Sequence, residues 1–120
     1  MLAAGETQIA RDELQWLLED CHDFLDAHRL LGEIALVDED FSLARGHFGY
    51  AFRLGQRAIQ QAGEPRPVSY SLPANRTFHE SGKGLVFCLV RMEKRDVAAE
   101  VVEFLLRCDP SDPLKVRQLI

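Results

Sequence analysis

The sequence has no long apolar run, no excess of basic residues and almost no strand-like alternation of apolar and polar residues. Without a stretch of about 18 apolar residues, we expect no transmembrane helix and no membrane partner. The net charge of -5 argues against nucleic acid as the partner, because no surplus of Lys and Arg can displace counterions. The chain starts without a basic flank and a long apolar core, so we expect no signal peptide and a cytoplasmic location.

Cysteine is also scarce, and the three cysteines are scattered among apolar residues at Cys21, Cys88 and Cys108. This pattern predicts reduced, buried thiols, with a disulfide or a reactive thiol as the alternative. Cys21 and His22 with His28 do not predict a metal site, because residues six apart do not share a helix face and no fourth ligand is evident. We expect no metal and no cofactor.

What the sequence does have is apolar residues at helical spacing along most of its 120 residues, enough for one domain with a sizeable core. Helices are predicted at about 7–21, 23–37, 41–61, 75–92 and 97–108, with a short last helix at 114–120. Three prolines and a glycine predict an irregular connection over 62–74. Asn75 is the predicted N-cap of the fourth helix, and Asp112 with Pro113 the predicted start of the last.

Small residues recur among the apolar ones in the second and third helices. Gly32 lies inside the second helix, where glycine costs about 1 kcal/mol relative to alanine, so we expect another helix to approach it closely. The third helix carries one continuous stripe in which large and small residues alternate, as interlocking helices require. The stripe consists of Phe41, Ala44, Phe48, Ala51, Phe52, Gly55, Ala58 and Ile59.

These small and large residues stand at positions that resemble the signature of a tetratricopeptide repeat. In the stretch 25–58, the signature places hold His28, Leu31, Gly32, Ala35, Phe41, Ala44, Phe48 and Ala51. His28 replaces the usual Trp and is expected in the core, and Gln56 replaces the closing Pro. The resemblance implies an all-α fold, a superhelix of antiparallel helical hairpins.

The same resemblance divides the single domain, residues 1–120, into parts. A half-repeat helix spans 7–22, the first repeat 25–58, a Pro-rich insertion 59–75, a second and more degenerate repeat 79–112, and a terminal helix 113–120. The two copies are offset by about 54 residues, where the regular period is about 34, so the insertion adds about 20.

The family implies a protein- or peptide-binding scaffold whose first helices line a groove. The candidate groove residues are Arg29, Glu33, Lys83 and Phe87, beside Asp26, Leu36, Glu80 and Val90. A basic pair next to apolar surface suits an extended peptide or an acidic tail. The Lys and Asn grip on a terminal carboxylate, well known in the family, is not expected, because Glu33 and Phe87 replace the needed Asn.

Two alternatives to a peptide-binding scaffold remain open. Half-repeats at both ends suggest a structural end-piece, either part of a longer array or weakly self-associating through Ile9, Trp16, Leu119 or Ile120. A small helical enzyme or sensor, with an acid/base pair such as His79 and Glu80, is the third reading. We find no catalytic constellation, so we expect that the protein is not an enzyme.

Overall fold

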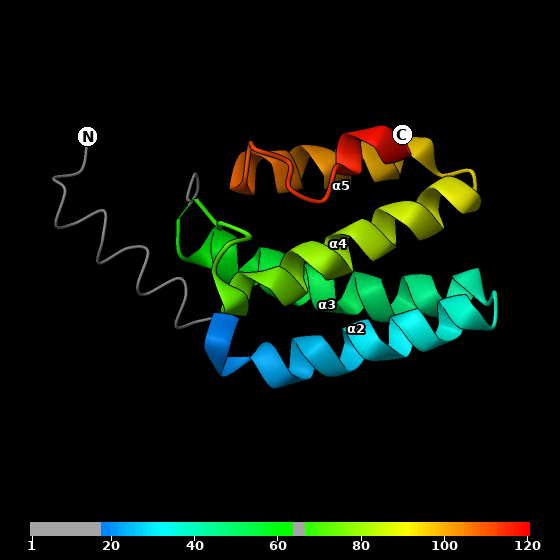
Figure 1. Ribbon diagram of the computed structural model, residues 1–120, viewed down its shortest axis with the longest axis horizontal. Coiled ribbons are helices and arrows are strands. Elements are labelled where there is room, and N and C mark those ends of the chain that lie inside the picture. The colour runs from blue at the N-terminus through cyan, green and yellow to red at the C-terminus, as the bar shows by residue number, and fades with distance from the viewer. Residues whose placement is uncertain (1–17, 64–66) are drawn as a thin grey trace, which may run out of the picture.

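The computed structural model describes residues 18–63 and 67–120, and there the chain is helical without any strand (Figure 1). The elements are α2 (His22–Val37), α3 (Phe41–Gln61), α4 (Pro73–Arg91), α5 (Arg95–Cys108) and the 3-10 helix η1 (Val116–Leu119). The predicted all-α class is therefore confirmed, and α3 has the predicted bounds. Most of the predicted helix at 7–21, and with it most of the half-repeat, lies outside the described residues, and its described end at 18–20 is helical.

Helices α2 to α5 follow one another from the bottom to the top of Figure 1, each reversing the direction of the one before. Helices α2 and α3 form a hairpin, α4 packs against both, and α5 and η1 pack against α4. Asp40 fixes the start of α3, because its carboxylate accepts a hydrogen bond from the Leu43 amide at 3.1 Å. This order brings α2 and α4, which are distant in sequence, side by side.

The ring of Phe48 joins three helices at the centre of the core. A Cβ atom on Gly32 of α2 would lie 2.8 Å from this ring, and one on Gly84 of α4 would lie 2.7 Å from it. Phe48 itself is 2% exposed. The close approach predicted at Gly32 is confirmed, and glycine is needed at both positions because a Cβ atom on either helix would overlap the ring.

A second interlock lies further along α3, at Gly55. A Cβ atom here would lie 2.3 Å from the ring of Phe78 on α4. That ring is stacked on Phe52 at 5.3 Å between centroids and meets Phe104 of α5 edge-on. The predicted stripe of α3 is buried at Ala44, Phe48, Ala51, Phe52, Gly55 and Ile59, and half-buried at Phe41 and Ala58.

Residues 67–72, between α3 and α4, lie across the ends of α4 and α5 as a strap. The Val68 side chain is fully buried, and its amide donates to the Cys108 carbonyl at 2.9 Å. The Tyr70 amide donates to Asp109 Oδ2 at 3.0 Å, and the imidazole of His79 donates to the Val68 carbonyl. The proline-rich connection is thus tied to both helices by hydrogen bonds.

Three local predictions are wrong. Helix α4 begins at Pro73 with Leu72 as its N-cap, because proline already has the φ of a first helical residue. Asn75 lies inside the first turn, and its side-chain amide donates to the Ser69 carbonyl at 3.0 Å. The last helix is only the 3-10 turn Val116–Leu119, since Asp112 and Lys115 have positive φ angles of 51° and 56°.

His28 is the third wrong prediction, since it is half-buried at the surface of the α2–α3 hairpin and not in the core. The core place beside Gly32 is filled by Phe48 from the other helix of the hairpin. The His28 ring instead lies 4.6 Å from the ring of Tyr50 on α3.

Acid is expected to destabilise the fold through His79. Burial lowers the pKa of this imidazole below its ordinary value of 6.5. The unfolded chain then binds the proton more readily, so the stability that neutral His79 contributes is complete above about pH 6.5 and is lost as the pH falls below it. We expect the midpoint of urea unfolding to fall between about pH 7.5 and about pH 5.

A His79→Gln variant is the control, because its amide still donates to the Val68 carbonyl but does not titrate. Its midpoint should fall less over the same pH range. An equal fall in both proteins would assign the acid sensitivity to other groups, such as His28.

Candidate functional site

Arg29 of α2 is engaged by three carboxylates of its own chain. Its guanidinium lies 2.8 Å from both Asp26 and Glu33, and its Nε atom lies 3.6 Å from Glu80 of α4. Only 17% of the Arg29 side chain is exposed. Among the predicted groove residues, Arg29 and Glu33 are thus brought together, and Arg29 links the two helices of the predicted groove.

An aromatic platform, formed by Phe41, Phe87 and Arg91, lies further along α4. The rings of Phe41 and Phe87 are 6.3 Å apart between centroids, and the Arg91 guanidinium lies 5.1 Å and 5.8 Å from them. Phe87 is 38% exposed. Lys83, one turn earlier on α4, is exposed, and none of the ion pairs within the described residues involves it. Lys83 and Phe87 therefore offer a cation and an aromatic ring at one surface.

A pair of histidines joins α2 to α3 on a different side of the hairpin. His28 and His47 approach through their Nδ1 atoms at 3.1 Å, so one donates and the other accepts. Burial and the neighbouring His47 lower the pKa of His28. Phe24 and Tyr50 flank the pair, with ring centroids 5.7 Å apart. In the sequence, Phe24 and His28 are i, i+4 neighbours, and His47 and Tyr50 are i, i+3 neighbours. The contact between the two pairs depends on the register of the α2–α3 hairpin.

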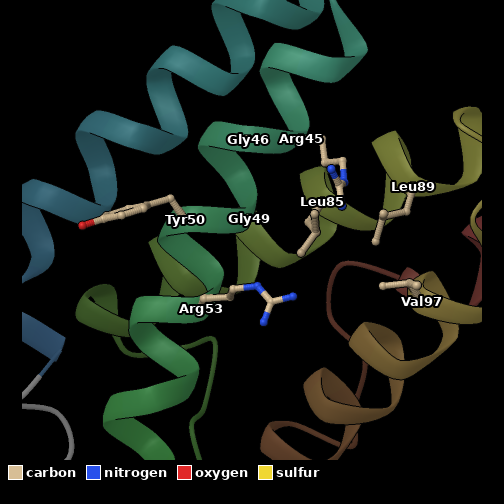
Figure 2. Close-up of a pocket in the computed structure, with 8 residues that line it drawn as sticks. All are labelled: Arg45, Gly46, Gly49, Tyr50, Arg53, Leu85, Leu89 and Val97. Atoms are coloured by element: carbon tan, nitrogen blue, oxygen red, sulfur yellow. The ribbon is translucent and has the colours of Figure 1, made fainter.

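A groove between α3 and α5, which we name the arginine groove, is shown in Figure 2. It encloses about 310 Å³, with Leu85 and Leu89 of α4 at its floor and Val97 of α5 on one side. Helix α3 contributes its other side through Arg45, Gly46, Gly49, Tyr50 and Arg53. Both arginines are exposed. Sequence reasoning missed this groove, although an α3 with three arginines and no carboxylate was a visible signal.

The candidate acid/base pair does not converge. His79 points to the backbone of the strap, whereas Glu80 accepts a hydrogen bond from the Tyr70 hydroxyl at 3.2 Å. Burial raises the pKa of the Cys88 thiol to about 11, which leaves little thiolate for reaction. The part of the chain that the structure describes holds no cluster of three metal-ligating side chains and no helix suited to crossing a membrane.

Comparison with known proteins adds no relative: no family model matches the chain, and no curated protein or solved structure is similar to it. The division into repeats and the groove assignment thus remain predictions from the residues.

Proposed function

We propose that this chain is a protein- or peptide-binding scaffold of the tetratricopeptide type, and that it holds its ligand on the surface formed by α2 and α4. Two consecutive helical hairpins, α2–α3 and α4–α5, support this proposal, because α4 packs against both α2 and α3. So do Gly32, Ala44 and Ala51, small residues buried where a neighbouring helix packs.

The observation that carries the proposal is the aromatic platform with Lys83 beside it. An exposed ring already stacked under an arginine offers a rigid apolar contact at little entropic cost. Lys83 adds a cation one turn away, and charge-assisted hydrogen bonds from Lys83 or Arg91 suit a carboxylate. The ligand that fits is an extended peptide with an apolar side chain next to an acidic one.

Arg29 has a different role in this proposal. Its three carboxylate partners compensate its charge, so an incoming acidic peptide would have to displace one of them. We assign Arg29 and Glu33 to holding α2 against α4 in the right position. Lys83 and Phe87 are assigned to direct contact with the peptide.

A random peptide library displayed on phage tests the proposal without a known partner. Selected peptides should combine acidic and aromatic or aliphatic residues, and Lys83→Glu should weaken their binding by at least about tenfold. Phe87→Ala should weaken it similarly through loss of the apolar contact. The affinity of synthetic peptides, measured by fluorescence anisotropy, gives these ratios.

Arg53→Glu is the matched control, since it reverses an exposed positive charge in the arginine groove, outside the proposed surface. It should leave peptide affinity within about twofold of the wild type. Selected peptides that bind Lys83→Glu and Phe87→Ala as tightly as the wild type would place the binding surface elsewhere and contradict the proposal.

A further inference from the structure

The outer side of α2 carries an apolar surface that the described part of the chain leaves exposed, although the Phe24 ring contacts Tyr50 of α3. Five large side chains there are exposed, from 44% at Leu31 to 83% at Val37, the others being Phe24, Leu30 and Ile34. We name these five residues the α2 face. Apolar residues at such helical spacing normally mark a surface that packs against another element, and so this one indicates an interface.

The arginine groove has an unusual pair of glycines, Gly46 and Gly49, in the middle of α3. A Cβ atom on Gly46 would meet nothing within 4 Å, and one on Gly49 would make only an ordinary contact with Leu85 at 3.6 Å. Packing among the described residues therefore does not require either glycine, in contrast to Gly32 and Gly55. Each glycine costs about 1 kcal/mol in a helix relative to alanine, and both keep the groove open for close approach from outside.

The α2 face and the arginine groove are opposite in charge. Residues 18–40 contain eight carboxylates and one arginine, Arg29. Two of these carboxylates, Asp26 and Glu33, already lie beside Arg29, as does Glu80 of α4. Residues 41–63 contain three arginines and no carboxylate. No ion pair within the described residues involves Arg45 or Arg53. A contact between the two surfaces would bring the unpaired cations next to the surplus carboxylates.

The two surfaces also match in form. Helix α2 presents apolar side chains between exposed carboxylates at Asp23 and Asp38, one near each end. The arginine groove presents apolar Leu85, Leu89 and Val97 between Arg45 and Arg53, one near each end (Figure 2). A helix side chain entering the groove would pass the glycine backbone of α3 and reach the leucine floor, while the carboxylates face the arginines.

We propose that the α2 face of one copy docks in the arginine groove of a second copy. The two surfaces are different, so the contact is head-to-tail, and each chain keeps one unused surface on which a further copy can add. The interface is separate from the aromatic platform, so it adds self-assembly to peptide binding and does not depend on it.

Sedimentation velocity over a concentration series up to the millimolar range tests this proposal. We expect the average mass of the wild type to rise above the 13.6 kDa of one chain as the concentration increases. Arg53→Glu in the groove and Ile34→Asp on the α2 face should each weaken association at least about tenfold. Both side chains are exposed, so both variants should fold, as circular dichroism can verify.

Mixing the two variants gives the most specific result. Each is defective at a different surface, so the intact α2 face of Arg53→Glu can still enter the intact groove of Ile34→Asp. The equimolar mixture should form a complex of about twice the 13.6 kDa chain mass that does not grow further, at concentrations where each variant alone associates at least about tenfold more weakly than the wild type.

Two matched controls separate this interface from general charge effects and from peptide binding. Lys83→Glu and Ala99→Asp alter exposed residues on α4 and α5 outside the groove, and both should associate like the wild type. A wild type that stays monomeric throughout, or a mixture with no dimer, would overturn the proposal. Loss of peptide binding in Lys83→Glu would leave the proposal of head-to-tail association unaffected.

Discussion

Phe48→Ala is expected to cost about 3–5 kcal/mol of the free energy of unfolding, the range for removing a large aromatic side chain from a core. The ring fills the space between Gly32 of α2 and Gly84 of α4. Neither glycine has a side chain that could move into the cavity, so relaxation can recover little of the loss. A domain with the usual total stability would retain only a small margin.

Urea denaturation followed by circular dichroism measures this loss. Leu43→Ala is the control, because Leu43 belongs to the same helix but is 52% exposed. It should change stability by no more than about 0.5 kcal/mol. A loss below about 1 kcal/mol for Phe48→Ala would show that the three helices are not held together at this ring.

Gly55→Ala is expected to destabilise the protein by about 1–3 kcal/mol, even though alanine forms helix better than glycine. The new methyl group would lie 2.3 Å from Phe78, which is fully buried and stacked on Phe52. The ring therefore has no direction in which to move. Thermal unfolding of the variant should show a clearly lower midpoint than that of the wild type.

Gly46→Ala is the control for Gly55→Ala, and we expect it to have the opposite effect on stability. The new methyl group at this position meets open space, so the helix should gain about 1 kcal/mol. The two identical substitutions on one helix should thus shift the unfolding midpoint in opposite directions. Equal shifts would mean that helix propensity, and not the contact with Phe78, determines the effect at Gly55.

Much of the fold could be predicted from periodicity because these helices are amphipathic and end at clear signals. The stripe from Phe41 to Ile59 and the acidic turn before it gave the bounds of α3 correctly. Gly32 could be predicted as a point of close contact, since a glycine inside a helix needs a compensating interaction. The start of α4 was wrong because proline and asparagine both begin helices, and local preference does not decide between them.

The surfaces were much less predictable than the core. Lys83 and Phe87 were identified from the resemblance, but Phe41 and Arg91 were not, because the contacts of Phe41 with Phe87 and Arg91 join the start of α3 to the end of α4. Arg29 looked like a ligand-binding cation, and only the packing of α2 on α4 brings Glu80 to it. The arginine groove likewise needs α5 placed opposite α3.

The sequence by itself determined the helical class, most helix positions and the buried stripe of α3, because these follow from spacing along one chain. Only the tertiary structure decided which glycines are required by packing and which charges are compensated. Gly32 and Gly46 look alike in the sequence, yet one lies against Phe48 and the other faces open space. That difference depends on which distant residues the folded chain brings together, and no local pattern contains it.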